Sequence, residues 1–146
     1  MDDTIAKFAS PAPIAVVGAT DETRKFGGYL YRELKRQGYR VYPVNARRAE
    51  VDGDRAYRSL RDIPDDVEGA VVAIRPDRAG EVVADALARG IRRIWFQQGA
   101  DFTEAARTAR EAGMETVVGK CILMYAGKAR GVHRFHAVLA RLFGRY

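Results

Sequence analysis

Residues suited to covalent or metal chemistry are scarce in this sequence of 146 residues. It has one cysteine, Cys121, and two histidines, His133 and His136. A single thiol excludes an internal disulfide and a cysteine-based metal cage. Both histidines lie beyond the expected fold, so the core has no matched serine–histidine–aspartate set, and no cluster of histidine and carboxylate residues has metal-ligand spacing. We therefore expect neither catalytic residues nor a metal site.

Long apolar runs are also absent. No stretch approaches the roughly 20 apolar residues that a membrane span requires. The first residues, MDDTIAKF, lack the basic and apolar parts of a signal peptide. The chain length suits one domain with a sizeable core. We therefore expect a single cytoplasmic domain over residues 1–146, with residues 1–12 as an N-terminal arm.

Acidic residues are missing from residues 119–146. Residues 1–118 hold 19 basic and 19 acidic side chains, whereas residues 119–146 hold six lysines or arginines and no acid, which accounts for the net charge of +6. Residues 132–143 predict a basic amphipathic helix within a C-terminal extension, residues 126–146. Such a helix binds nucleic acid, an acidic membrane surface or a partner, or it packs on its own domain or on a second copy. The sequence leaves these alternatives open.

Five apolar segments alternate with helical patterns along the chain. Strands are expected at residues 14–17, 39–44, 69–74, 91–96 and 115–118. Helices are expected at residues 29–38, 77–89 and 103–112, each with a glycine at its end. This alternation is typical of a parallel sheet with helices on both faces. With right-handed crossovers it predicts a doubly wound five-stranded α/β fold, with strand order 3-2-1-4-5 counted along the chain.

The loop after the first strand has the features of a phosphate-binding loop. Gly18 ends the strand, and Gly27 and Gly28 lead into the first helix. The start of a helix offers unpaired N–H groups and the positive end of the helix dipole to an anion. Arg24 and Lys25 lie in the same loop and either contact the phosphates or remain solvated. The loop therefore predicts a bound nucleotide.

The carboxyl ends of the strands are the expected binding site, because ligands of such sheets bind where the strand order reverses. The candidates at these ends are Gly18, Ala19, Thr20, Pro43, Val44, Asn45, Ile74, Arg75, Pro76, Gln97, Gln98 and Gly99. The dinucleotide-binding motif fits poorly, because Thr20 occupies the position of its second glycine and no carboxylate follows the second strand. A ligand with several phosphates fits better, and NAD(P) binding is kept as an alternative.

An ordered set of short motifs extends over roughly residues 12–125. The motifs are VVGAT, KFG, GYRVYPVN, IRP, IWFQQG and GMETVVGKC. In this order they resemble the stand-alone CoA-binding proteins, which are Rossmann-type domains similar to the CoA-binding domain of the succinyl-CoA synthetase alpha subunit. The sequence departs from that family at Ala46, where the family usually has proline.

The resemblance implies that coenzyme A lies across the strand ends. Its adenosine would lie near residues 43–45, and residues 74–76 and 97–99 would line the rest of the cleft. Its phosphates would lie at residues 18–20 and at Arg24, Lys25, Phe26 and Gly27.

Two kinds of function are consistent with this reading. The first is a non-catalytic binding or regulatory module for CoA or an acyl-CoA, alone or as a homo-oligomer. The second is a CoA-linked enzyme that uses Cys121 as its thiol, with Lys120 beside it to lower the thiol pKa. A small buried cysteine with a packing role is the competing interpretation of Cys121.

Overall fold

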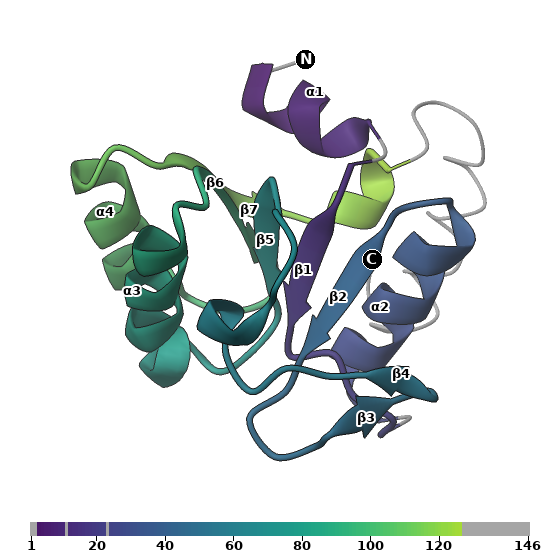
Figure 1. Cartoon of the computed structure of the whole chain (residues 1–146). Helices are drawn as coiled ribbons and strands as arrows, with labels where there is room; N and C mark the ends of the chain where they lie inside the picture. Colours follow the sequence, from purple (N-terminus) through teal and green to yellow (C-terminus); the bar gives the residue numbers. More distant parts are fainter. Residues whose placement is uncertain (1–2, 11, 23, 127–146) are drawn as a thin grey trace.

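A five-stranded parallel sheet forms the centre of the computed structural model, which describes residues 3–10, 12–22 and 24–126 (Figure 1). Its strands are β1 (Ile14–Val17), β2 (Val41–Val44), β5 (Gly69–Val72), β6 (Arg93–Gln97) and β7 (Glu115–Lys120). The connecting helices are α2 (Phe26–Arg36), α3 (Ala79–Arg89) and α4 (Thr103–Glu111). The predicted α/β fold class with five parallel strands is confirmed.

The order of the strands differs from the prediction in one respect. The sheet runs β2-β1-β5-β6-β7, which is 2-1-3-4-5 when the parallel strands are counted along the chain. Ile14 of β1 pairs with Val41 on one side and with Gly69 on the other, so the third strand adds next to the first and not beyond the second. The predicted order was wrong because apolar runs indicate buried parallel strands without indicating on which side each one joins the sheet. The chain therefore reverses its direction across the sheet between β1 and β5.

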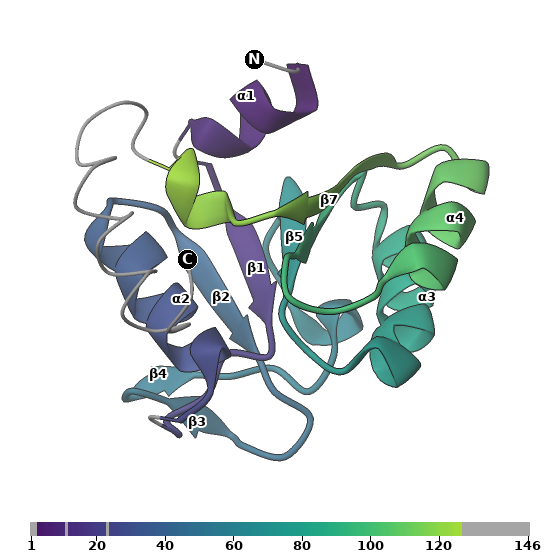
Figure 2. The same cartoon turned by 180° about the vertical axis from the view of Figure 1, so that it is seen from behind.

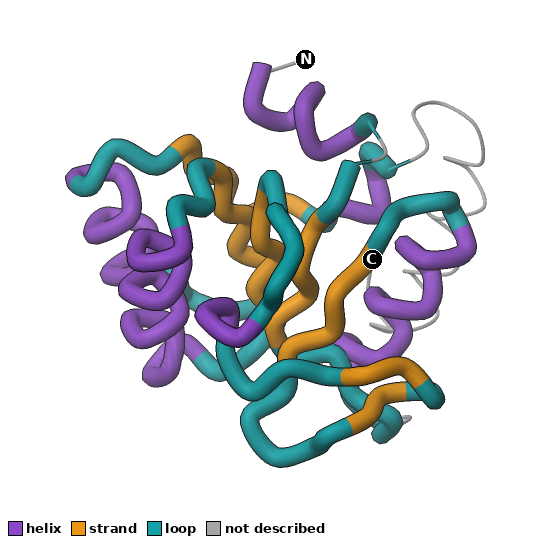
Figure 3. Tube along the Cα trace, viewed as in Figure 1, coloured by secondary structure: helices purple, strands orange, loops and turns teal. Residues whose placement is uncertain are grey.

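Helices cover both faces of the sheet (Figure 1, and from behind in Figure 2). Helix α2 lies on one face, where Leu30 and Leu34 are buried against β1. Helices α3 and α4 lie side by side on the other face, where Val83 and Ala106 join the second core. In Figure 3 the strands form the inner layer and the helices flank it. The strands are therefore buried on both faces, as their continuous apolar sequences require.

The segment predicted as an N-terminal arm contains a helix, α1 (Asp3–Ala9). Phe8 is almost fully buried and meets the Trp95 ring edge-on, with 5.3 Å between ring centroids. The Tyr39 hydroxyl donates a hydrogen bond of 2.7 Å to the Phe8 carbonyl. A Cβ atom at Gly69 would lie 2.7 Å from the Phe8 ring, so glycine at the start of β5 makes room for this helix. Residues 3–9 thus belong to the core.

Shorter elements complete the described chain. A two-stranded antiparallel hairpin, β3 (Glu50–Val51) and β4 (Asp54–Arg55), follows β2 and turns at Asp52-Gly53, where both residues have positive φ. Three 3₁₀ turns are η1 (Leu60–Asp62), η2 (Pro76–Arg78) and η3 (Ile122–Met124). The hairpin lies at the opposite end of the sheet from α1 (Figure 1). The predicted basic helix of residues 132–143 lies outside the described residues.

Candidate functional site

The loop between β1 and α2 is packed closely against the ends of two strands. Gly18 has a φ of 105°, and its N–H donates a 2.9 Å hydrogen bond to the Val44 carbonyl at the end of β2. A Cβ atom at Gly18 would collide with the Ala73 carbonyl after β5, and one at Gly27 would collide with the Gly18 carbonyl. Glycine is therefore required at both positions, and α2 begins directly against the end of β1. The helix starts at Phe26, three residues earlier than the sequence indicated.

The amino end of α2 carries no compensating acid. Its N-cap residue is Lys25, no side chain caps the helix, and the first turn contains no Asp or Glu. The partial positive charge of this helix end is therefore not neutralised within the first turn. This is the arrangement that favours an anion at a helix start.

A carboxylate lies beside this helix end. Glu22 Oε2 is 3.4 Å from the Lys25 ammonium and 3.9 Å from the Arg48 guanidinium. The Thr20 hydroxyl accepts a 3.2 Å hydrogen bond from the Glu22 N–H and lies 3.5 Å from the same carboxylate oxygen. Glu22 thus faces all three groups, and Asp21 lies 3.8 Å from the same arginine.

Asn45 joins the loop after β2 to the loop after β1. Its Nδ2 donates a 2.9 Å hydrogen bond to the Ala19 carbonyl. Its Oδ1 accepts hydrogen bonds from the N–H groups of Arg47 (2.8 Å) and Arg48 (3.1 Å). The Asn45 side chain therefore holds the backbone that carries these two arginines.

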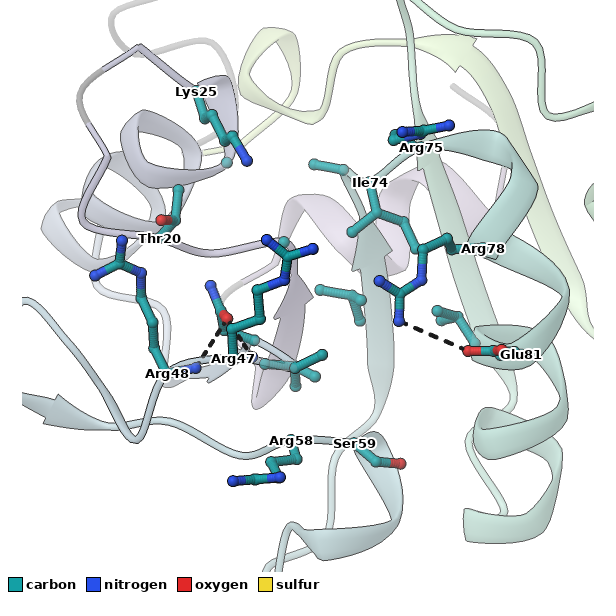
Figure 4. Close-up of a pocket in the computed structure, with 18 of the residues that line it drawn as sticks. Thr20, Lys25, Arg47, Arg48, Arg58, Ser59, Ile74, Arg75, Arg78 and Glu81 are labelled. Carbon is teal, nitrogen blue, oxygen red and sulfur yellow. Dashed lines mark hydrogen bonds and ion pairs between the residues drawn. The ribbon is translucent and has the colours of Figure 1, made fainter.

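A cleft of about 1080 Å³ opens at the carboxyl ends of β1, β2 and β5 (Figure 4). It lies next to the point between β1 and β5 where the chain reverses its direction across the sheet. Such a point is where ligands of open parallel sheets bind. Ten of the sixteen residues predicted for the site line it, namely Gly18, Thr20, Lys25, Phe26, Gly27, Val44, Asn45, Ile74, Arg75 and Pro76.

The other six predicted residues lie elsewhere in the described structure. Ala19 is buried in the loop after β1, and Pro43 is buried in β2. Arg24 is exposed on the loop after β1 and does not line the cleft. The end of β6 forms hydrogen bonds with the end of β7 and the start of η3. Gln97 Oε1 accepts one of 3.2 Å from the Ile122 N–H, and the Gln98 N–H donates one of 3.2 Å to the Lys120 carbonyl. Gln97, Gln98 and Gly99 do not line the cleft, whereas Ala100, which follows them in the same loop, does.

Several polar residues of the cleft were not predicted from the sequence. They come from the connection after β2, from η2 and from α3, and they are Arg47, Arg48, Arg58, Ser59, Arg78, Glu81 and Asp85. The adjacent arginines after Asn45 were a usable signal, because they directly follow a strand end. Arg78 lies two residues after the predicted Pro76, in the same 3₁₀ turn. The remaining residues give no such signal, because only the tertiary fold brings η1 and α3 to this edge of the sheet.

Positive charge exceeds negative charge in the cleft. Its lining contains six lysine or arginine side chains and three acidic ones. Arg78 lies 3.9 Å from Glu81, and Arg75 pairs with Asp77 at 3.1 Å. Among the described residues, the guanidinium groups of Arg47 and Arg58 have no ion-pair partner. The cleft can therefore accept a ligand with several negative charges.

Cys121 does not take part in this site. It is 1% exposed, lies in the core on the α2 side of the sheet and does not line the cleft. Burial raises the pKa of its thiol, which opposes the formation of a reactive thiolate. Nor do the described residues contain a group of three or more side chains suited to a metal ion. The described part of the chain also has no helix that is both long and apolar enough to span a membrane.

Comparison with protein families identifies this architecture. The model of the CoA binding domain matches residues 12–126, which include the whole sheet and every residue of the cleft. The chain belongs to the CoA-binding domain family. The resemblance inferred from its motifs is thereby confirmed.

The chain is similar both to a part of a larger enzyme subunit and to proteins of about its own length. The chain is 34% identical over 88 residues to the alpha subunit of the ADP-forming acetate–CoA ligase II of Pyrococcus furiosus, and it spans 19% of that subunit's length. A hypothetical protein of Pyrococcus horikoshii superposes with a TM-score of 0.78 and 30% identity, over 95% of this chain and 92% of that one. A conserved hypothetical protein of Pyrococcus furiosus gives a TM-score of 0.73 and 35% identity, over 77% and 97%.

Proposed function

We propose that the cleft binds coenzyme A or an acyl-CoA, and that the protein is a non-catalytic binding or regulatory module. The observation that supports this best is the cationic cleft at the switch point, in a chain that belongs to the CoA-binding domain family. A helix whose first turn holds no acid, glycines that allow close approach and arginines with no ion-pair partner among the described residues suit a ligand with several phosphates. A cytoplasmic location is part of this proposal.

The absence of catalysis is inferred from the polar groups around the cleft. The Ser59 hydroxyl accepts the Arg61 N–H at 3.1 Å and donates to Asp85 at 2.9 Å, so it caps η1 and ties it to α3. Asp85 is also paired with Arg61 at 2.7 Å. A nucleophilic serine needs an adjacent base that is free to take its proton, and this carboxylate is already occupied. The ligase relative has a subunit several times longer than this chain, so its activity is not transferred to this protein.

An NADP-binding role is the second candidate. The arginines that follow β2 occupy the region where a dinucleotide-binding protein holds the 2′-phosphate of NADP. A role for NAD itself is less consistent, because Asn45 stands where an acid would hold the ribose hydroxyls.

Thermal unfolding with matched ligands tests these alternatives. A ligand that binds only the native state at 100 times its Kd stabilises it by about 2.7 kcal/mol. For a domain of this size that corresponds to a rise in Tm of about 5–10 °C. We expect such a rise with CoA and a smaller one with NADP or NAD at equal concentration. Equal shifts with all three ligands, or no shift with CoA, would overturn the proposal.

A further inference from the structure

Cationic side chains lie at separate edges of the cleft. Thr20 and Lys25 lie at one edge with the start of α2, and Arg58 and Ser59 lie at another, with Arg47 between these two edges in the view of Figure 4. Arg75 and Arg78 lie on a third side, next to Glu81. A diphosphate group bound at the amino end of α2 does not by itself account for a second cationic edge. The arrangement suits a ligand that carries two separate anionic groups.

The position of Arg58 is set by its neighbours on both sides. The Tyr57 N–H donates a 2.9 Å hydrogen bond to the Pro43 carbonyl, and the Tyr57 carbonyl accepts one of 2.9 Å from the Asn45 N–H. Residue 57 thus extends the sheet beyond the edge of β2. On the other side, Ser59 is fixed by its hydrogen bonds to Arg61 and Asp85. Arg58 lines the cleft at this rim, and because both of its neighbours are anchored, little further ordering of its backbone is needed when its guanidinium binds a ligand.

The charges around Arg58 leave its guanidinium available. Asp85, which also lines the cleft, is paired with Arg61 and accepts a hydrogen bond from the Ser59 hydroxyl. Glu81 is paired with Arg78 on the α3 side. Arg58 is exposed and has no ion-pair partner among the described residues. An arginine of this kind forms its strongest hydrogen bonds with a phosphate or a carboxylate.

We propose that Arg58 forms a second anion subsite, which binds the phosphate on the ribose of the nucleotide and makes the protein selective for CoA over 3′-dephospho-CoA. This inference rests on the proposed function, because it assumes that the diphosphate of CoA lies at the start of α2. A phosphate monoester carries a charge of about −1.5 to −2 at pH 7 and has three acceptor oxygens. Binding of this group to Arg58 would leave Lys25 and the α2 end to the diphosphate.

Titration calorimetry with both ligands tests the assignment. Charge-assisted hydrogen bonds of this kind correspond to about 10- to 100-fold in affinity. We expect the unaltered protein to bind CoA that much more tightly than 3′-dephospho-CoA. In Arg58→Ala the affinity for CoA should fall by a similar factor, while the affinity for 3′-dephospho-CoA changes less than about twofold. Arg58→Lys keeps the charge but not the planar pair of donors, so its affinity for CoA should lie between those of the unaltered protein and Arg58→Ala.

Arg110→Ala is the matched control, since it makes the same change of charge on an exposed position of α4 outside the cleft. It should bind both ligands as the unaltered protein does. Equal affinity of the unaltered protein for the two ligands would overturn the inference. An equal loss of affinity for both ligands in Arg58→Ala would also overturn the inference, because such a result would place Arg58 against the adenine or the diphosphate. No binding of CoA to the unaltered protein would instead refute the proposed function.

Discussion

Glu22 is predicted to weaken the binding of anionic ligands, and its replacement should strengthen it. The carboxylate of this half-exposed side chain faces Lys25 and Arg48 at 3.4 and 3.9 Å. A phosphate that enters the helix end must replace Glu22 at these two cations and must lie close to a like charge. Glu22→Gln removes the charge and keeps a side chain of similar shape that still accepts a hydrogen bond from Thr20.

The expected gain follows from the two ion pairs. Exposed pairs of this kind contribute about 0.2–1 kcal/mol each, so Glu22→Gln removes ion pairs worth about 0.4–2 kcal/mol that compete with the ligand. Since about 1.4 kcal/mol corresponds to a factor of ten, the affinity for CoA should rise by about 2- to 30-fold. The gain should shrink as salt is added, because ions screen exposed charges.

Calorimetric titration of CoA into the Glu22→Gln protein, at low and at high salt, measures this gain. Glu111→Gln serves as the control, because it removes an acid from α4 that does not line the cleft. An unchanged affinity would mean that Glu22 is remote from the bound phosphates. A reduced affinity would mean that Glu22 is needed to orient Lys25 and Arg48, and either result would refute the reasoning.

Three further predictions concern the framework of the site. Gly27→Ala should lower the free energy of unfolding in urea by about 1–3 kcal/mol and weaken CoA binding, because the added Cβ meets the Gly18 carbonyl. The control Gly80→Ala, whose Cβ meets nothing within 4 Å, should raise the free energy of unfolding by about 0.5–1 kcal/mol. Equal effects of the two substitutions would contradict this reasoning. Cys121 should stay unmodified by iodoacetamide in the folded protein at pH 8, as read from intact mass, because burial raises its pKa and excludes the reagent; rapid labelling would reopen a reactive role. The hydrogen bond from Lys35 lowers the pKa of Asp54, so the stabilisation by the Asp54 carboxylate is present above its unfolded pKa and is lost as the pH falls through its folded pKa. Between pH 6 and pH 3 the free energy of unfolding should therefore fall less in Asp54→Asn than in the unaltered protein. An identical fall in the two proteins would contradict this.

Much of the fold could be predicted from the sequence, because local signals carry it. Apolar runs and glycine stops located the five parallel strands and the three connecting helices. The loop that ends at Gly27 was also predicted, because close backbone approach selects glycine locally. Ten of the predicted site residues line the cleft for the same reason, since each lies within three residues of a strand end or a helix start.

The strand order illustrates the limit of such signals. Pro43 could have been used to predict it, because a strand between two neighbours needs its N–H donors on both sides and proline lacks one. The structure places Pro43 in β2 at the edge of the sheet. The predicted order put the strand that ends at Gln97 beside the first strand, and Gln97 was therefore expected to line the cleft. In the structure β5 occupies that place in the sheet.

The sequence by itself determined the α/β class, the glycine-containing loop between β1 and α2 and the family, because these depend on the spacing of residues that are neighbours in the chain. Only the tertiary structure decided that β5 lies beside β1, that α1 belongs to the core and that Arg58 and Arg78 reach one cleft. The physical reason is that these contacts join segments far apart in the chain, and the free energy of packing them is a property of the whole core and of no single stretch.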